Sequence, residues 1–434
     1  MEMNRQDQRL FFDGCDTVEL AKKYGTPLYL VSLSSIYEKV KQLKSAFTDR
    51  YENTRIAYAA KAFLTKGMVR IIDELDLCLD VVSGGELDCA LRAGFPPERI
   101  EFNGNNKLPW EIDLAVKSGV GRLIIDGFNE LDGIIESAKK HHRTVPVLIR
   151  LTPGVSADSH DYIVTGKKDS KFGFPVDSPA LYRTIEQAIE SEYTDFLGFH
   201  FHIGSQLESN EVYLDSLDIV FELLKKLRKE RGFVSKELNI GGGFGIRYTE
   251  EDDPKPFDYF FTPVMEKIDA FFKEEGMPRP EIVTEPGRSL IGEAGRTLYT
   301  VGSIKEIAGL RRYVMIDGGM NDNIRPALYQ AKYHVVNASK YDQEPTELST
   351  VSGKICESGD ILAKDVLLAP TEPGDILAFY STGAYGYSMA SNYNKIPVPA
   401  VVLLYKGKDE LMVKRQTLEE LHRNDLIPEM ISRL

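Results

Sequence analysis

Several features that mark specialised classes of protein are absent from this 434-residue chain. No apolar run reaches the roughly 20 residues that a membrane-spanning helix needs. The opening stretch, MEMNRQDQRLFFDG, has no apolar core, so we expect no export signal. There is no CxxC pair, which argues against a disulfide framework or a zinc-finger site and is typical of a reduced cytoplasmic protein. The four cysteines are Cys15, Cys78, Cys89 and Cys356.

An excess of positive charge is also missing. The chain has 53 lysines and arginines against 66 aspartates and glutamates, which gives a net charge of −13. Such a surface repels phosphate backbones and argues against nucleic-acid binding. We find no internal repeat and no low-complexity linker. What is present is a 42% share of hydrophobic residues, enough for a sizeable core, in a chain long enough for two domains.

One pattern recurs between about residues 35 and 290. A short apolar run ends in polar residues or glycine, and a stretch with apolar residues at helical spacing follows, as in 215–230. Alternating strands and helices of this kind form parallel sheets. Eight such units over roughly 250 residues predict a (β/α)8 barrel, with a doubly wound open sheet as the alternative. The runs are 55–61, 79–83, 100–105, 122–126, 145–151, 196–202, 237–243 and 281–287.

After about residue 290 the sequence becomes rich in β-type segments. They are broken by glycine, proline and asparagine, and long helical patterns are scarce. This predicts an all-β domain of the β-sandwich or Greek-key type, which the strand-like segment 26–32 is expected to join. We therefore predict a barrel domain at 35–290 and a β domain made of 1–34 plus 291–434. A short closing helix is expected over 418–431.

Residues able to bind or react stand where the eight runs end. Functional residues of a barrel lie on the loops that follow its strands. We therefore expect these side chains to line one mouth of the barrel. They are Lys61, Asp80, Ser83, Arg150, His200, His202, Ser205, Gly241, Gly242, Gly243, Glu285, Gly287 and Arg288.

Lys61 and the glycine loop each have an ordinary interpretation beside a functional one. A lysine at a strand end is usually a surface residue whose stem packs on apolar groups, whereas a buried one is paired, neutral or covalently bonded. The glycines 241–243 could serve only a turn. After a strand, however, they expose backbone N–H groups suited to a phosphate, and Ser205 offers a hydroxyl at the neighbouring strand end. No GK[ST] sequence follows, which excludes a nucleotide-triphosphate loop.

His200 and His202 alternate along one run and so share a face. They are open to three interpretations: hydrogen-bonded core histidines, a metal pair of a barrel hydrolase, or an imidazole stacked on an aromatic cofactor. Glu285 in TEPGR is either a loop carboxylate paired with an arginine or a carboxylate that keeps a ring nitrogen protonated. An aldehyde for Lys61, a phosphate for the glycines and a pyridine nitrogen for Glu285 together describe pyridoxal 5′-phosphate (PLP).

A series of motifs between about residues 20 and 420 resembles bacterial diaminopimelate decarboxylases. These belong to the alanine-racemase-like, fold-type III group of PLP enzymes. The resemblance implies a PLP-binding barrel followed by a β domain that contributes to the active site, in agreement with the pattern above. The motifs are YAAKAF, DVVSGGEL, FNGNNK, HFHIGSQ, LNIGGGFGI, EPGRS, NDNIRPALY, CESGD and GAYGYSMASNYN.

The resemblance also implies a cofactor site without a metal. Lys61 is expected to bond covalently to PLP, His202 to stack on its ring, and Glu285 to bind the pyridine nitrogen. The other cofactor-binding residues that we expect are Ser205, Gly242, Gly243, Pro286, Gly287, Arg288, Tyr385 and, from its place at the mouth, Asp80.

The resemblance further implies a substrate site shared between two chains. Either Cys356 or the freed Lys61 is expected to donate a proton. Cys356 and Glu357 are expected to reach into the partner's site, which implies a homodimer. The substrate-binding residues that we expect are Arg288, Arg325, Tyr329, Glu357 and Tyr385.

Charge distinguishes the substrates that such a site accepts. Arg288 and Arg325 offer forks for a distal carboxylate, and Glu357 offers an anion for its ammonium group. Ornithine has no distal carboxylate, so these charges favour decarboxylation of meso-2,6-diaminopimelate to L-lysine. The alternatives are a decarboxylase of another basic amino acid or carboxylated polyamine, a metal-dependent barrel hydrolase using His200 and His202, and a non-catalytic relative that binds the cofactor.

Overall fold

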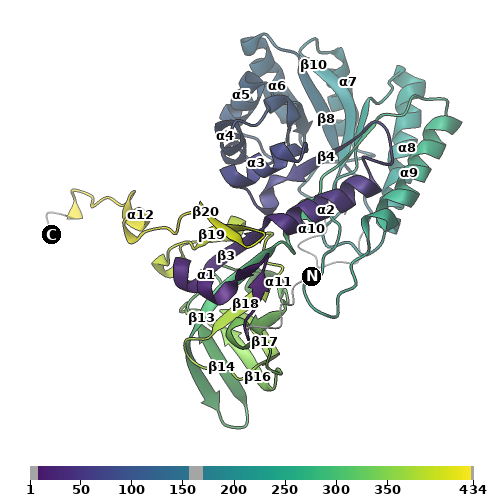
Figure 1. Cartoon of the computed structure of the whole chain (residues 1–434). Helices are drawn as coiled ribbons and strands as arrows, with labels where there is room; N and C mark the ends of the chain where they lie inside the picture. The colour runs from purple at the N-terminus through teal and green to yellow at the C-terminus, as the bar shows by residue number, and fades with distance from the viewer. Residues whose placement is uncertain (1–7, 156–169, 432–434) are drawn as a thin grey trace. The chain divides into compact units, whose positions relative to one another are not determined.

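The computed structural model describes residues 8–155 and 170–431. The chain forms two compact units, drawn in Figure 1. We call Tyr37–Arg247 with Asp252–Ile291 the barrel unit, and Met1–Ile36 with Tyr248–Glu251 and Gly292–Leu434 the β unit. The expectation of no export signal depends partly on residues 1–7, which lie outside the described residues.

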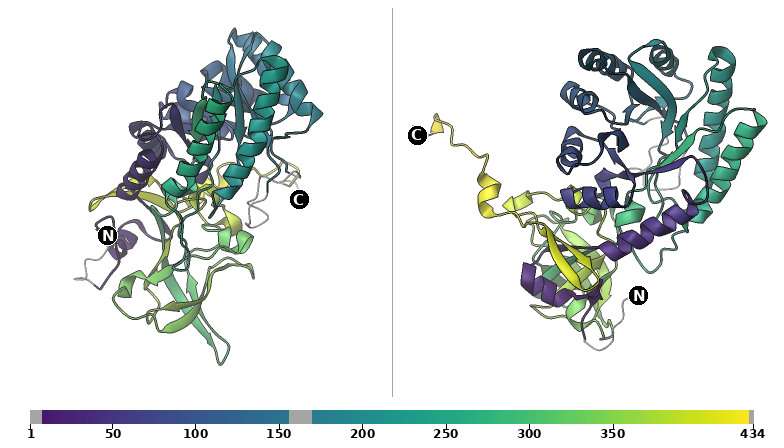
Figure 2. Two further views of the ribbon diagram at one scale, coloured as in Figure 1. Left: turned by 90° about the vertical axis from the view of Figure 1, so that its right-hand side faces the viewer. Right: turned by 45° about the horizontal axis from the view of Figure 1, so that its top comes forward.

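Eight parallel strands form a closed ring in the barrel unit (Figures 1 and 2). They are β4 (Thr54–Ala59), β5 (Cys78–Val81), β6 (Ile100–Phe102), β7 (Arg122–Ile125), β8 (Val145–Thr152), β10 (Thr194–Phe201), β11 (Glu237–Asn239) and β12 (Glu281–Thr284). The ring closes because β8 pairs with β10 and β12 with β4. The predicted (β/α)8 barrel is therefore confirmed, and the open doubly wound sheet is excluded. A two-residue strand, β9 (Phe174–Pro175), adds to the end of β8.

Helices cover the outside of the ring, and all of those named below except α2 follow one of its strands (Figure 2). Side chains directly after the strands fix where two helices begin: Thr65 accepts the N–H of Met68, and Ser83 accepts that of Glu86. The amphipathic stretch predicted at 215–230 lies within one helix, as expected. The helices are α2 (Leu33–Ala46), α3 (Lys66–Glu74), α4 (Gly84–Arg92), α5 (Pro109–Ser118), α6 (Phe128–His141), α7 (Pro179–Glu190), α8 (Glu211–Arg231), α9 (Phe257–Glu274) and α10 (Arg288–Ile291).

Charged side chains fill the ring near the amino ends of its strands. Arg55 of β4 lies 2.7 Å from Glu101 of β6 and 2.9 Å from Glu237 of β11, and Arg122 of β7 lies 2.6 Å from Glu237. Charges can be buried there because each one has a partner of opposite sign. The loops that carry the predicted functional residues follow the other, carboxyl ends of the strands.

The β unit is built around one mixed sheet (Figure 1). Its central path runs β17-β16-β14-β13-β3-β19-β20, and β18 pairs with β13 and β15. Its strands are β3 (Leu28–Ser32), β13 (Gly295–Ile307), β14 (Arg311–Ile316), β15 (Val335–Asn337), β16 (Glu347–Ser352), β17 (Ile361–Leu368), β18 (Ile376–Tyr380), β19 (Ala400–Tyr405) and β20 (Lys408–Val413). Segment 26–32 joins this sheet through β3, as predicted, because its side chains are buried against β13 and β19.

The closing helix predicted over 418–431 is shorter than expected. Helix α12 covers only Leu418–His422. Beyond it, Leu426 and Ile427 are 88% and 81% exposed, so the apolar pattern there does not pack on the β unit. Pro428 interrupts the pattern, and a short helix that buries no apolar face is not stable alone. None of the helices in the described part of the chain combines the length and the apolar character needed to cross a membrane.

Candidate active site

Glu285 follows strand β12 and is buried at the carboxyl end of the ring. Its Oε1 accepts hydrogen bonds from Nδ2 of Asn103 at 3.1 Å and Nδ2 of Asn239 at 2.8 Å. Its Oε2 lies 2.9 Å from Nε2 of His200. A carboxylate has about four acceptor positions, so these three donors leave one for a ligand.

Opposing effects set the ionisation of Glu285. Burial raises its pKa, but the electrostatic interaction and hydrogen bond with His200, together with the electrostatic interactions with His202 and Lys61, outweigh burial and lower the pKa to about 2. Glu285 is therefore a carboxylate at neutral pH, and Nε2 of His200 is the donor in their hydrogen bond. Such a carboxylate can keep the proton of a ring nitrogen in place.

Asp80, at the end of β5, is held in the same cluster. Its Oδ1 accepts a hydrogen bond of 2.6 Å from Nδ2 of Asn103, the amide that also donates to Glu285. Burial, and then the charge of Glu285, raise the pKa of Asp80 well above its ordinary value. Asn103 therefore joins two carboxyl groups whose pKa values are shifted in opposite directions.

Lys61 lies just beyond β4, in the single-turn helix η1 (Ala60–Ala62). The residues on either side of it are buried, whereas Lys61 itself is exposed. Its ammonium interacts electrostatically with Asp80, Glu285 and His202. The structure therefore brings the predicted lysine to the same end of the ring as the buried carboxyl groups.

His202 follows β10 and is kept neutral by its surroundings. Burial first, and then the charges of Lys61 and Arg150, lower its pKa well below the ordinary value. Its Nδ1 accepts a hydrogen bond of 3.3 Å from the N–H of Gly242, which leaves its ring proton on Nε2. A neutral imidazole in contact with the glycine loop is compatible with stacking on a ring.

The glycine loop, residues 241–243, has no room for a side chain at any of its three positions. A Cβ atom on Gly242 would lie 2.0 Å from the carbonyl oxygen of Glu285, and one on Gly243 would lie 2.3 Å from that of Gly204. Gly243 also has a φ of +118°, which side chains rarely allow. Within the described residues, the N–H of Gly243 donates to no protein acceptor, as expected for an amide that contacts an anion.

Ser205 and Arg288 are brought together beside this loop. Nε and Nη2 of Arg288 donate to Oγ of Ser205 at 3.2 and 3.0 Å. Arg288 begins the short helix α10 directly after the Glu285–Gly287 turn. In that turn the carbonyl of Pro286 accepts the N–H of Ala59 at 3.1 Å, and a Cβ on Gly287 would lie 3.0 Å from Cβ of Ala59. The turn is thereby fixed close to the strand that precedes Lys61.

Other predicted substrate-binding residues lie in the β unit, around a buried guanidinium group. Arg325 begins helix α11 (Arg325–Tyr329), and its Nε donates to the hydroxyl of Tyr333 at 2.9 Å. The group also lies within 6 Å of three tyrosine rings, at 5.1 Å from Tyr329, 5.6 Å from Tyr385 and 5.8 Å from Tyr248. Aromatic contacts of this kind hold a guanidinium in one orientation. The structure therefore groups Arg325, Tyr329 and Tyr385.

Cys356 and Glu357 lie in the β unit on the loop between β16 and β17. Cys356 is exposed, although its residue type alone favours a buried position. Its backbone N–H donates to Oδ1 of Asn394 at 2.8 Å, which fixes the loop. Both side chains are exposed on a single chain.

Comparison with known proteins gives the family of this chain. A family model described as pyridoxal-dependent decarboxylase, pyridoxal binding domain, matches residues 33–292. A diaminopimelate decarboxylase of Bacillus subtilis (strain 168) is 47% identical over 425 residues, which cover 98% of this chain and 97% of that protein. The chain belongs to the diaminopimelate decarboxylase family.

Two further relatives agree with this assignment. A diaminopimelate decarboxylase of Staphylococcus aureus (strain COL) is 43% identical to this chain. The match covers 97% of this chain and 98% of that protein. A crystal structure of diaminopimelate decarboxylase from M. jannaschii matches this chain with a TM-score of 0.92 at 36% identity, and the match covers 98% of both chains. A second crystal structure of the M. jannaschii enzyme, in complex with L-lysine, matches with the same TM-score and identity. The resemblance inferred from the motifs, the fold and the PLP requirement are confirmed.

The barrel residues fit PLP, the cofactor of the diaminopimelate decarboxylase family. The glycine loop approaches its neighbours so closely that side chains would fill the space, and it offers the N–H of Gly243. Glu285 is ionised and retains an acceptor position, and Lys61 supplies an exposed amine. A phosphate, a protonated pyridine nitrogen and an aldehyde are the groups that these residues match.

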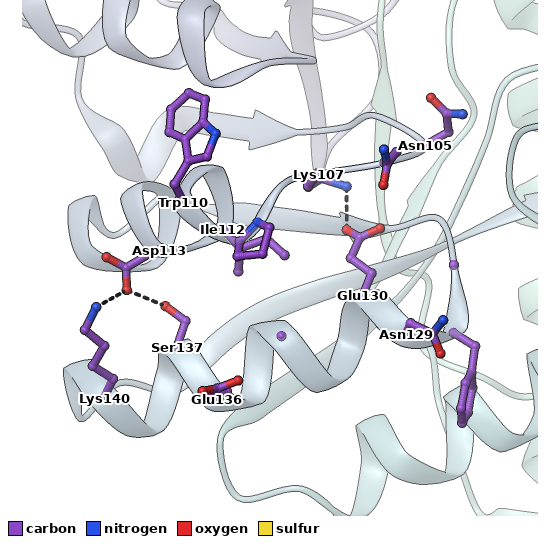
Figure 3. Close-up of a pocket in the computed structure, with 15 residues that line it drawn as sticks. Asn105, Lys107, Trp110, Ile112, Asp113, Asn129, Glu130, Glu136, Ser137 and Lys140 are labelled. Atoms are coloured by element: carbon purple, nitrogen blue, oxygen red, sulfur yellow. Dashed lines mark hydrogen bonds and ion pairs between the residues drawn. The ribbon is translucent and has the colours of Figure 1, made fainter.

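The barrel unit also contains a hollow away from these residues. It has a volume of about 980 Å³ and is lined by residues of α5, α6 and the loops before them. Figure 3 shows Lys107 and Trp110 there, with Nζ of Lys107 2.6 Å from Oε1 of Glu130. None of the predicted site residues lines this hollow. Lys107 also donates to the carbonyls of Gly104 and Ile124, so its role is to join the β6 and β7 loops.

Sequence reasoning missed four residues of these clusters. Asn103 and Asn239 carry a signal that was not used, because each is a polar residue at a strand end. Tyr248 and Tyr333 carry none, because they contact Arg325 only through the folding of the β unit. Ser83, expected at the mouth, instead caps α4.

Proposed function

We propose that this chain catalyses the PLP-dependent decarboxylation of meso-2,6-diaminopimelate to L-lysine and CO2, the last step of bacterial lysine biosynthesis. The observation that carries the proposal is the ionised, buried Glu285 at the same end of the barrel as the amine of Lys61. Near-full-length relatives that are diaminopimelate decarboxylases support the substrate, as does a related structure in complex with L-lysine.

The residues of this chain divide the work as follows. When bound, PLP supplies an aldehyde that bonds to amines and a ring that takes up the electrons left by the departing carboxylate. Lys61 would bond covalently to the cofactor, Glu285 would accept a hydrogen bond from its protonated pyridine nitrogen, and neutral His202 would lie against its ring. Asp80 completes the surroundings of Lys61. The other residues that hold the cofactor are Ser205, Gly242, Gly243, Pro286, Gly287, Arg288 and Tyr385.

Charge selects the substrate. Arg325 and Arg288 bind the distal carboxylate, and Arg325 is suited to this because tyrosines already hold its guanidinium. Glu357 binds the distal ammonium, while Tyr329 and Tyr385 complete the substrate contacts. Cys356 returns a proton to the carbon that has lost CO2. A substrate without a distal carboxylate gives the buried guanidinium of Arg325 no anionic partner. This disfavours ornithine.

The enzyme acts as a homodimer in which Cys356 and Glu357 serve the partner's site. Their exposure on a single chain supports this arrangement. The PLP-binding domain is 35–290, and residues 1–34 with 291–434 form the domain that completes the active site. A cytoplasmic location is supported by the four cysteines, all of which are unpaired.

The metal-dependent hydrolase is not favoured. His200 is engaged by Glu285, and no group of three or more metal-binding side chains occurs in the described ranges, 8–155 and 170–431. Mixing the purified protein with PLP tests the proposal directly. We expect visible absorbance that borohydride bleaches and that Lys61→Ala abolishes, and release of CO2 from diaminopimelate but not from ornithine. Absence of the absorbance, or activity that only a chelator removes, would contradict it.

A further inference from the structure

Asn239 joins the two parts of the cofactor site. It is the last residue of β11 and its side chain is fully buried. Its Nδ2 donates to Oε1 of Glu285 at 2.8 Å and to Oε2 of Glu101 at 2.9 Å, and its Oδ1 accepts the N–H of Gly241 at 2.9 Å. One side chain thus contacts both the carboxylate expected at the ring nitrogen and the first amide of the glycine loop.

Only an amide can make this set of bonds. A backbone N–H donates only, and an ionised carboxylate accepts only, so the nitrogen of Asn239 must face Glu285 and its oxygen must face Gly241. An aspartate could accept from Gly241 but would place a further acidic group between Glu101 and Glu285. Glutamine would add a methylene group in a site where Asn239 is fully buried.

The backbone reinforces the same connection. The carbonyl of Gly241 accepts the N–H of Glu285 at 2.8 Å and the hydroxyl of Thr284 at 2.8 Å. Gly241 is therefore held on its carbonyl side by the strand that precedes Glu285 and on its N–H side by Asn239. Without Asn239, the N–H of Gly241 and one acceptor position of Glu285 would be buried and unpaired.

We propose that Asn239 is a positioning residue that sets the distance between Glu285 and the glycine loop, and so matches the site to a ligand carrying both a ring nitrogen and a phosphate. The inference rests on the proposed PLP-dependent function. Asn239 itself touches neither the substrate nor the reacting atoms.

Asn103 provides a matched comparison. It also donates to Oε1 of Glu285, but its other bond goes to Asp80 and not to the glycine loop. Removing Asn103 should therefore disturb Glu285 and Asp80 but not the glycine loop, whereas removing Asn239 should disturb Glu285 and the phosphate site together.

The test measures the affinity of cofactor-free protein for PLP and for pyridoxal, which lacks the phosphate. The dissociation constant for pyridoxal divided by that for PLP reports how strongly the phosphate contributes to binding. We expect Asn239→Ala to lower this ratio about fivefold, the effect of losing one hydrogen bond that orders the loop. Asn103→Ala should weaken both ligands by similar factors and leave the ratio at the wild-type value.

Each outcome separates the alternatives. A ratio in Asn239→Ala equal to that in Asn103→Ala would overturn the inference, because Asn239 would then serve Glu285 alone. Asn239→Leu has a similar volume and no polar side-chain atom, so it removes the same bonds and serves in place of the alanine variant if circular dichroism shows that the alanine variant does not fold. Wild-type protein that binds neither ligand would instead refute the proposed function.

Discussion

At the scale of single residues, the site depends on shifting the pKa values of two buried carboxyl groups in opposite directions. Asp80 and Glu285 share the amide of Asn103, yet His200 donates only to Glu285. Burial raises the pKa of both groups, and the positive surroundings of Glu285 reverse the effect there alone. The result is a carboxylate at Glu285, which can pair with a cationic ring nitrogen, beside a carboxyl group whose ionisation is disfavoured.

The lowered pKa of Glu285 predicts how stability depends on pH. Its pKa falls from 4.5 to about 2 on folding, so its contribution is present above pH 4.5 and is lost as the pH falls through 2. At about 1.4 kcal/mol for each pKa unit, the full contribution is about 3 kcal/mol. We expect cofactor-free Glu285→Gln to lose less stability than the wild type between pH 5.5 and 3. Urea unfolding at both pH values measures this, and equal losses would contradict the assignment.

At the scale of elements, the glycine loop and the turn after β12 depend on each other. The N–H of Glu285 donates to Gly241, and the position of a Cβ on Gly242 is already occupied by the carbonyl of Glu285. The loop after β10 closes the other side, where Gly204 takes the same role for Gly243. The loops after β10, β11 and β12 are therefore in direct backbone contact. A side chain added to the glycine loop would displace its neighbours.

This packing predicts that Gly242→Ala damages cofactor binding. The added methyl group meets backbone atoms at 2.0 and 2.7 Å, and no flexible side chain can move aside to relieve the contact. We expect PLP affinity to fall at least about tenfold and stability to fall by about 1–3 kcal/mol. Equilibrium titration and urea unfolding measure the two effects.

Gly85→Ala is the control for that change. Gly85 lies in α4, and the nearest atom to an added Cβ is Oγ of Ser83 at 3.8 Å, an ordinary contact. Alanine favours a helix by about 1 kcal/mol over glycine, so we expect this variant to be at least as stable as the wild type. Equal damage in both variants would show that crowding at Gly242 is not the cause.

At the scale of the whole molecule, the proposed active site needs residues from two chains. Lys61 belongs to the barrel unit, while Cys356 is exposed on the β unit, where a second chain can reach it. In a symmetric dimer, a site built across the interface occurs twice, and each copy draws on both chains. Defects in different residues should therefore complement each other between chains.

We expect this complementation between Lys61→Ala and Cys356→Ala. Each variant alone should be inactive, but a heterodimer purified through two different affinity tags should have one intact site and about half the activity of the wild type. CO2 release from diaminopimelate measures it. An inactive heterodimer would show that each site uses one chain only.

Pairing the wild type with the double variant Lys61→Ala/Cys356→Ala is the matched control, with opposite expectations. If sites are shared, one site lacks the lysine and the other lacks the cysteine, so this heterodimer should be inactive. If each chain has its own site, the wild-type chain should retain about half of the activity. Together, the activities of the two heterodimers distinguish sites shared between chains from sites formed within one chain.

The sequence by itself determined the alternation of strands and helices and the identity of most strand-end residues. The apolar runs, their spacing and the residues that end them are local features, whereas the closure of the strands into a ring depends on the pairing of β8 with β10 and of β12 with β4. Lys61, His202, Ser205 and Glu285 could be named because each stands at or shortly after the end of such a run. The strand at 26–32 could be assigned to the β domain for the same reason.

Only the tertiary structure decided which of these residues act together. His200 became the partner of Glu285, and Asn239 became the bridge to the glycine loop, because the ring places β10, β11 and β12 side by side. The tyrosines around Arg325 come from segments far apart in the chain. The pKa values of Asp80 and Glu285 likewise depend on burial and on charges brought close by folding, which no sequence pattern contains.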